Sequence, residues 1–237
     1  MSPYLRHHTI FSRKQRTRSV MPIFTKHTTP QVRCLFIHIP KTGGTSLENA
    51  LHRLGWLEQL KSPAPIREEG PLDSVKHFKI SPQHYHALLL DQIIRWEAID
   101  LCFTVCRHPF HRLKSEYYWQ RELGIAPAGQ PKEWLTRVME QFSNEPSAFD
   151  NHLRPQVEFI PPDHSCKVFR LEDDGVNRAL AWVDAAAPAS RLRAWALAAF
   201  PAWRHKSAPA KEVEVAFAGL RQEIETFYSR DMAYFGY

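Results

Sequence analysis

The sequence lacks several features that each mark a particular class of protein. It has no run of about 18 apolar residues, which a membrane-spanning helix needs, and no apolar core of a secretory signal. Its four cysteines form no CxxC pair, so we expect reduced structural thiols in a cytoplasmic protein. Residues 34–237 have no excess of positive charge, with 24 Lys and Arg against 25 Asp and Glu, so we expect no nucleic-acid partner.

The net charge of +6 comes from the N-terminal end of the chain. Residues 1–33 carry seven Lys or Arg and no Asp or Glu. We therefore expect residues 1–31 to form a basic flexible tail and residues 32–237 to form one domain. The same composition is typical of an organelle transit segment, and Met21 offers a second start that would leave residues 1–20 upstream of the natural protein. The sequence leaves these alternatives open.

Apolar runs alternate with helical patterns along the remaining chain. Buried strands are predicted at 35–39, 99–106 and 166–170, with a further short strand at 74–80. Helices are predicted near residues 45–58, 81–96, 109–122, 131–142, 146–153, 174–184, 189–199 and 209–228. This alternation predicts an α/β fold, namely a single P-loop-like domain with a mostly parallel central sheet and helices on both faces.

A turn with two glycines follows the first strand. Gly43 and Gly44 let the backbone close around a bound group, and the amides of such a turn, with a helix N-terminus behind them, suit phosphate or sulfate oxygens. Lys41 adds a positive charge, in an order opposite to Walker A, where the lysine follows the glycines. A plain strand-to-helix turn with a surface lysine is the alternative. The predicted anion-binding residues are Pro40, Lys41, Thr42, Gly43, Gly44, Thr45 and Ser46.

A second anion site is predicted where the strand at 99–106 ends. Arg107 stands at the carboxyl end of that strand, where open α/β sheets bind ligands, and Ser115 lies about two helical turns later. A guanidinium fork with a serine hydroxyl suits a terminal phosphate monoester. Alternatively, Arg107 only caps the following helix.

The two motifs together resemble those of a known family. Pro40-Lys-Thr-Gly-Gly-Thr-Ser46 is similar to the 5′-phosphosulfate loop, and Arg107-His-Pro-Phe-x-Arg-x-x-Ser-x-Tyr117 to the 3′-phosphate motif, of sulfotransferases that use 3′-phosphoadenosine-5′-phosphosulfate (PAPS). The resemblance is to the carbohydrate (heparan sulfate 2-O-like) group and its bacterial relatives, and it covers about residues 34–237. It implies transfer of a sulfuryl group from PAPS to a hydroxyl of a glycan or glycoconjugate. No Walker B acid or metal-ligand spacing is present, so no metal is expected.

The resemblance also implies catalytic residues. His77 lies in a Lys-His-Phe segment that corresponds to the family's catalytic histidine, although many relatives have Gly where this chain has Lys76. An imidazole is suited to take the acceptor proton near neutral pH. His84 and His86 are rivals for this role, and His84 is also a candidate acceptor contact. Lys41 is expected to stabilise charge on the leaving phosphate.

Weaker similarities extend over the rest of the chain. Arg154 and Gln156 are expected to contact the acceptor or donor. Residues His205, Lys206 and Ser207 resemble a shortened form of the loop that closes over the nucleotide, although a solvated turn explains them equally well. The aromatic residues Tyr117, Tyr118, Trp119 and Trp134 are expected either to stack on sugar rings or to pack in the core. Two rival functions remain, a P-loop-like kinase or NTPase and a non-catalytic nucleotide-binding relative.

Overall fold

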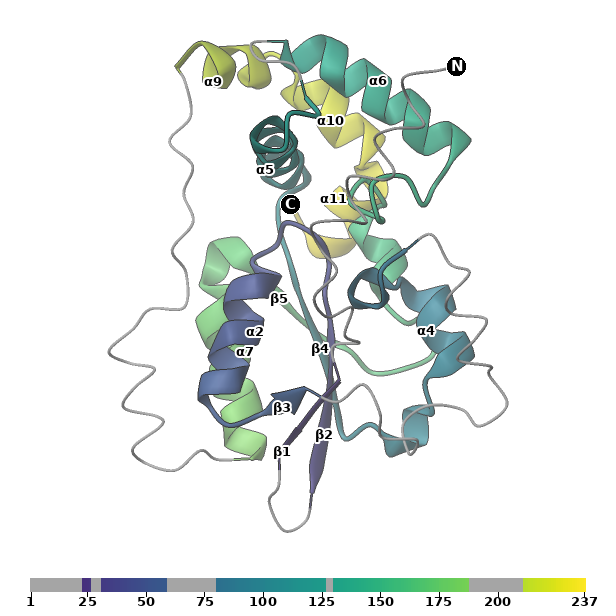
Figure 1. The fold of residues 1–237 in the computed structure, drawn as a ribbon, viewed down its shortest axis with the longest axis vertical. Coiled ribbons are helices and arrows are strands. Elements are labelled where there is room, and N and C mark those ends of the chain that lie inside the picture. Colours follow the sequence, from purple (N-terminus) through teal and green to yellow (C-terminus); the bar gives the residue numbers. More distant parts are fainter. Residues whose placement is uncertain (1–22, 27–30, 59–79, 127–129, 188–210) are drawn as a thin grey trace.

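The structure is a computed structural model that describes residues 23–26, 31–58, 80–126, 130–187 and 211–237 (Figure 1). Its centre is a five-stranded sheet with the order β3-β1-β2-β4-β5. The strands are β1 (Ile23–Lys26), β2 (Val32–Ile37), β3 (Leu57–Glu58), β4 (Leu101–Cys106) and β5 (Lys167–Arg170). The pairs β2–β4 and β4–β5 are parallel, whereas β1 pairs antiparallel with β2 and β3. The predicted α/β fold is confirmed, with an antiparallel edge added to the parallel strands.

The strand β1 corrects the predicted extent of the flexible tail. The sequence places Ile23–Lys26 in that tail, whereas in the structure these residues pair with β2, and Ile23 and Phe24 are buried. The Lys26 ammonium donates to the carbonyl of Ala187 and lies 3.7 Å from Asp184. Two apolar residues in a polar segment are too short a signal for a strand, because the pairing partner supplies most of its stability. The ordered domain therefore begins before residue 32.

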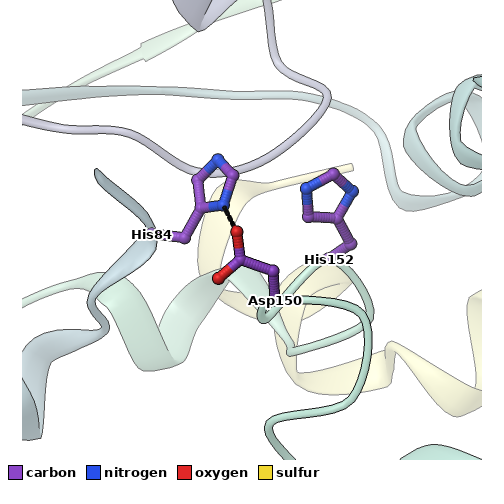
Figure 2. A group of neighbouring side chains, drawn as sticks. All are labelled: His84, Asp150 and His152. Carbon is purple, nitrogen blue, oxygen red and sulfur yellow. Dashed lines mark hydrogen bonds and ion pairs between the residues drawn. The ribbon is translucent and has the colours of Figure 1, made fainter. Parts of the chain in front are cut away.

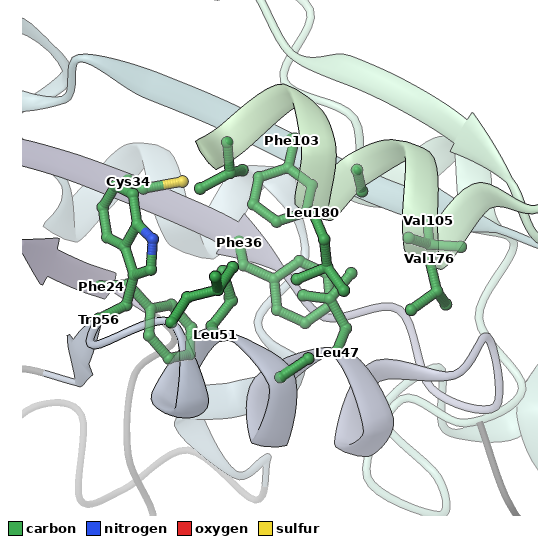
Figure 3. Close-up of a cluster of buried hydrophobic side chains, with 14 of the residues drawn as sticks. Phe24, Cys34, Phe36, Leu47, Leu51, Trp56, Phe103, Val105, Val176 and Leu180 are labelled. Carbon is green, nitrogen blue, oxygen red and sulfur yellow. The ribbon is translucent and has the colours of Figure 1, made fainter. Parts of the chain in front are cut away.

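Helices cover both faces of the sheet. On one face, α2 (Gly44–Arg53) and α7 (Gly175–Ala186) pack against Phe36 and Phe103 of the central strands (Figure 3). On the other face, α4 (Ala87–Ile93) and the short 3₁₀ helix η2 (Trp96–Ala98) pack against Leu35 and Ile37, and the 3₁₀ helix η1 (Pro82–His84) precedes α4. Burial of these apolar faces on both sides explains the nearly continuous apolar runs of β2 and β4.

A third group of helices lies beyond one end of the sheet (Figure 1). It consists of α5 (Pro109–Glu122), α6 (Pro131–Asn144), α9 (Lys211–Ala218) and α10 (Arg221–Phe227), which share a core around the fully buried Trp134 and Phe217. The remaining elements are η3 (Gln156–Phe159), η4 (Leu171–Asp173) and α11 (Ser229–Phe235). No helix among the described residues is both long enough and apolar enough to cross a membrane.

Three predicted helices differ from the structure. The helix predicted at 81–96 is interrupted because Tyr85 and His86 adopt extended backbone between η1 and α4. The helix predicted at 146–153 is instead a turn, in which Phe149, Asp150 and Asn151 have left-handed φ angles of 51°, 59° and 64°. The helix predicted at 209–228 breaks into α9 and α10, and α11 follows. The segments 74–79 and 189–199 lie outside the described residues.

The parallel arrangement brings the two predicted anion sites to one edge of the sheet. Strands β2 and β4 are direct neighbours, and both run toward the helical group that contains α5 (Figure 1). The turn at 38–43 follows β2, and the turn at 107–108 follows β4. Carboxyl ends of adjacent parallel strands are the usual ligand site of open α/β sheets.

We predict that Leu51 of α2 contributes strongly to stability. Its side chain is fully buried against the sheet, so Leu51→Ala should lower the free energy of unfolding by about 2–5 kcal/mol in urea titrations. Leu88 of α4 is 69% exposed and provides the matched control, for which Leu88→Ala should change the free energy by no more than about 0.5 kcal/mol. Equal losses in the two variants would contradict this assignment of the core.

Candidate active site

The turn after β2 forms a tight loop at the start of α2. Lys41 and Gly43 both have left-handed backbone, with φ angles of 68° and 94°, and α2 begins at Gly44. Thr42 is buried, and its hydroxyl donates to the carbonyl of Ile39 at 2.8 Å. The amide of Ser46 donates to the carbonyl of Gly43. The amides of Gly44 and Thr45 come before this bond, in the first turn of α2, where helix amides have no partner within the helix. The loop thus presents amides, the positive end of a helix and the Lys41 side chain in one place.

The second predicted site lies against this loop. One guanidinium nitrogen of Arg107 donates to the carbonyl of Lys41 at 3.3 Å. Burial lowers the pKa of Arg107 from its ordinary value, while the Glu172 carboxylate acts in the opposite direction. Ser115 lies half-buried on α5, on the helix that starts just after Arg107. The two motifs, which are 66 residues apart along the chain, are therefore in direct contact.

Gln156 holds the backbone of Arg107 in place. Its side-chain oxygen accepts from the Arg107 amide at 2.9 Å, and its side-chain nitrogen donates to the Arg107 carbonyl at 2.7 Å. The buried Asp231 carboxylate in turn accepts from the backbone amides of Gln156 and Val157 at 2.8 and 2.9 Å. The predicted contact of Gln156 with a ligand stays a prediction, and within the protein its side-chain amide bonds the Arg107 backbone.

Arg112 connects segments of the candidate site, a role that the sequence alone does not predict. Its side chain is buried, and its guanidinium donates to the carbonyls of Pro40 at 3.0 Å, Arg154 at 2.9 Å and His152 at 2.7 Å. It therefore joins the anion loop to the segment at 152–154. Arg112 is the second arginine of the Arg-His-Pro-Phe-x-Arg motif, and that fixed position was the available signal.

Three histidines, each paired with a carboxylate, lie beside the loop. The Nδ1 atoms of His38, His84 and His152 lie 2.7 Å from Glu48, 2.8 Å from Asp150 and 2.7 Å from Glu116, respectively. The His84 ring contacts the His38 and His152 rings edge-on, with centroids 5.1 and 5.0 Å apart. Of these six residues only His84 was a predicted site residue. His38 and Glu48 lie ten residues apart, whereas Glu116, Asp150 and His152 are brought together from distant parts of the chain.

The charge states of these pairs follow from burial and hydrogen bonding. Burial lowers the pKa of His84 to about 4, so its imidazole is neutral near pH 7. Burial alone would raise the pKa of Asp150, but hydrogen bonds from His84 and Ser81 lower it below its ordinary value. Burial likewise opposes ionisation of Glu116, yet the attraction of His152 and Lys41 lowers its pKa. The site therefore holds anionic carboxylates beside its histidines.

Lys41 is held near this group by an aromatic ring. Its ammonium lies 4.9 Å from the centroid of the Trp119 ring, and the His152 ring lies 4.8 Å from the same indole. Burial lowers the pKa of Lys41, and the Glu116 and Glu122 carboxylates oppose that shift. Trp119 is thus part of the site. Tyr117 and Trp134 are fully buried in the helical core, which excludes them as surfaces for stacking a sugar.

The other predicted residues are less well placed or lie beyond the described chain. The Arg154 guanidinium donates to Asn151 at 2.9 Å and to Glu158 at 2.6 Å, so it binds within the protein. His86 is buried, and its Nδ1 lies 3.3 Å from the Asn151 amide nitrogen. The predicted base and the predicted nucleotide-covering loop lie outside the described residues, namely His77, His205, Lys206 and Ser207.

We predict that Gly44 is required by the His38 ring. A Cβ atom at Gly44 would lie 2.0 Å from His38 Nε2, so Gly44→Ala should lower the free energy of unfolding by about 1–3 kcal/mol in denaturant titrations. Adding His38→Ala should remove part of that loss, because the clashing ring is absent. Gly219→Ala is the control, since its nearest contact is 3.5 Å away. Strict additivity of the two changes at 38 and 44 would refute the contact.

Comparison with known proteins agrees with the geometry of the two motifs. No curated protein and no solved structure matches the chain. A family model described as "Sulfotransferase family" matches residues 27–237, which include the anion loop, the Arg107 turn and the three paired histidines. Because this match spans most of the chain, the protein belongs to the sulfotransferase family.

Proposed function

We propose that this sulfotransferase moves a sulfuryl group from PAPS to a hydroxyl group of a carbohydrate. The observation that carries the proposal is the contact between the two anion-binding turns, in which Arg107 donates to the Lys41 carbonyl at 3.3 Å. PAPS carries anionic groups at both its 5′ and 3′ positions, and two adjacent cationic turns match that pair. The carbohydrate class of acceptor rests on the resemblance of the motifs to the heparan sulfate 2-O-like group.

The loop residues would act on the reacting end of the donor. Sulfuryl transfer, by analogy with phosphoryl transfer, passes through a loose state in which negative charge grows on the leaving phosphate oxygen. The Lys41 ammonium and the first amides of α2 are positioned to stabilise that charge, and Arg107 with Ser115 would hold the 3′-phosphate. This assignment uses no metal ion.

A histidine would accept the proton of the attacking hydroxyl. The resemblance of the Lys-His-Phe segment favours His77, whereas the contacts of the described residues support His84. Asp150 accepts from Nδ1 of His84, which leaves Nε2 with a lone pair for the acceptor proton. Ser81 holds Asp150 through its backbone amide at 2.5 Å, so the orientation of the pair is fixed. We therefore propose His84 as the base, with His77 and His86 as the rivals to be tested.

We predict selective binding of adenosine 3′,5′-bisphosphate, the nucleotide product of the reaction. It should raise the melting temperature of the protein, and ATP with magnesium should not. Arg107→Ala should lower the affinity for the bisphosphate about 10- to 100-fold, because the charge-assisted hydrogen bond proposed between Arg107 and the 3′-phosphate is lost. The affinity for adenosine 5′-monophosphate, which has no 3′-phosphate, should change little.

Calorimetric titration measures both affinities. Arg95→Ala is the control, because Arg95 forms a surface pair with Glu97 at 3.2 Å. Stronger stabilisation by ATP with magnesium would favour the kinase or NTPase alternative. Equal losses for the two nucleotides would reject the 3′-phosphate role of Arg107.

We predict that His84 is needed for transfer and not for donor binding. A labelled-sulfate screen over glycans, lipids and small alcohols identifies an acceptor. With that acceptor, His84→Ala should lower kcat at least about 100-fold, because the proposed base is lost. The affinity for the bisphosphate should stay nearly unchanged, because His84 is not among the residues proposed to bind the nucleotide. Asp150→Asn should also lower kcat, because the carboxylate that fixes the tautomer of the His84 imidazole is lost. If His77→Ala or His86→Ala abolishes transfer and His84→Ala does not, the base is that other histidine. Bisphosphate binding with no transfer to any acceptor would favour the non-catalytic alternative.

A further inference from the structure

Two histidines and a carboxylate form a compact group beside the anion loop. Ligand atoms of His84, Asp150 and His152 all lie within 4.8 Å of one another (Figure 2). The three side chains come from η1 and from the left-handed turn at 149–151 with the residue that follows it. Their side chains are only 8%, 12% and 7% exposed, respectively. Two imidazoles and one carboxylate are a recurrent ligand set for divalent transition metals.

The surroundings of the group match those of known metal ligands. Glu116 accepts from Nδ1 of His152 at 2.7 Å, so Nε2 is the nitrogen that points toward the His84–Asp150 pair in Figure 2. Asp150 is fixed in turn by the Ser81 backbone amide at 2.5 Å and by the Ser81 hydroxyl. Metal-binding histidines commonly have such a carboxylate on their second nitrogen, and bound carboxylates commonly have hydrogen-bond donors behind them.

The charge of the group also favours a dication. Two carboxylates contact the histidines of the group, Asp150 at 2.8 Å from His84 Nδ1 and Glu116 at 2.7 Å from His152 Nδ1. The guanidinium of Arg112 donates to the His152 carbonyl at 2.7 Å and to two further backbone carbonyls. One divalent ion would neutralise the two carboxylates in a site that excludes most water.

We propose that His84, Asp150 and His152 bind a divalent cation such as Zn²⁺, which replaces the proton between His84 Nδ1 and Asp150. A tetrahedral zinc ion with bonds of about 2.0–2.1 Å holds its ligand atoms roughly 3.3 Å apart. The His84–Asp150 pair, now at 2.8 Å, needs to open slightly, and the His152 ring needs to move inward. The cation is a competitor for the proton and not a resident cofactor of the enzyme.

The proposed ion would change the chemistry of His84. With the cation on Nδ1, the single proton of the neutral imidazole moves to Nε2, so Nε2 no longer has a lone pair for an acceptor proton. Zn²⁺ therefore inhibits sulfuryl transfer. This consequence rests on the proposed role of His84, whereas the binding of the ion does not.

The test is a direct measurement of cation binding by the full chain. Protein freed of metal with a chelator is titrated with Zn²⁺ against a chromophoric competitor, and the visible spectrum of bound Co²⁺ reports the ligand set. The wild-type chain should bind one ion at this group. His152→Ala should weaken binding at least tenfold and change the Co²⁺ spectrum. His164→Ala is the matched control, because His164 also lies near a carboxylate, 3.5 Å from Asp91, on another part of the chain.

A second, more conservative variant separates loss of the cation from loss of the fold. Asp150→Asn preserves the size of the side chain and replaces the carboxylate with a poor metal ligand. This variant should also lower the affinity for Zn²⁺ at least tenfold. Circular dichroism and unfolding midpoints show which variants keep the fold. The proposal is overturned if the wild-type chain binds no ion, or if folded His152→Ala or Asp150→Asn binds it as tightly as wild type. Failure to bind adenosine 3′,5′-bisphosphate would reject the proposed function and leave the cation result unaffected.

Discussion

The buried guanidinium of Arg112 is the contact on which the arrangement of this site depends. It donates to three backbone carbonyls, which belong to the anion loop at Pro40 and to the segment carrying His152 and Arg154. Without it, these three carbonyls would lose the hydrogen bonds that the guanidinium donates, and the loop would lose one of its contacts with the segment at 152–154. Because a planar guanidinium fixes the directions of its hydrogen bonds, Arg112 sets the separation of the two sides as well as their contact.

The carboxylates of the site each have a hydrogen-bonding partner within the protein. Each of the carboxylates Glu48, Asp150 and Glu116 has a histidine partner, and Glu116 also attracts Lys41. Such pairing offsets part of the large cost of burying carboxylates. The protein therefore keeps acidic side chains close to the proposed anion site, each paired with a histidine.

The sequence predicted the parts of this architecture that are encoded locally. The strand–turn–helix units around Lys41 and Arg107 were predicted correctly because apolar runs, glycines and Pro109 mark their boundaries. The carboxylate partners of the histidines were not predicted. Asp150 and Glu116 lie 66 and 36 residues from their histidines, and no motif marks Glu48, ten residues from His38, as its partner. The turn at 149–151 was predicted to be a helix because its left-handed backbone depends on tertiary contacts. Asp150 bonds the Ser81 amide, and Asn151 bonds the His84 carbonyl.

The long spans of these contacts have a consequence for how the protein folds. Ser81 and Asp150 are 69 residues apart, Arg112 and Pro40 are 72 apart, and Gln156 and Asp231 are 75 apart. Closing such loops costs chain entropy before any of these contacts can form. We therefore expect the parallel strands to pair first and to bring the segments of the site together. The polar network would then form late in folding.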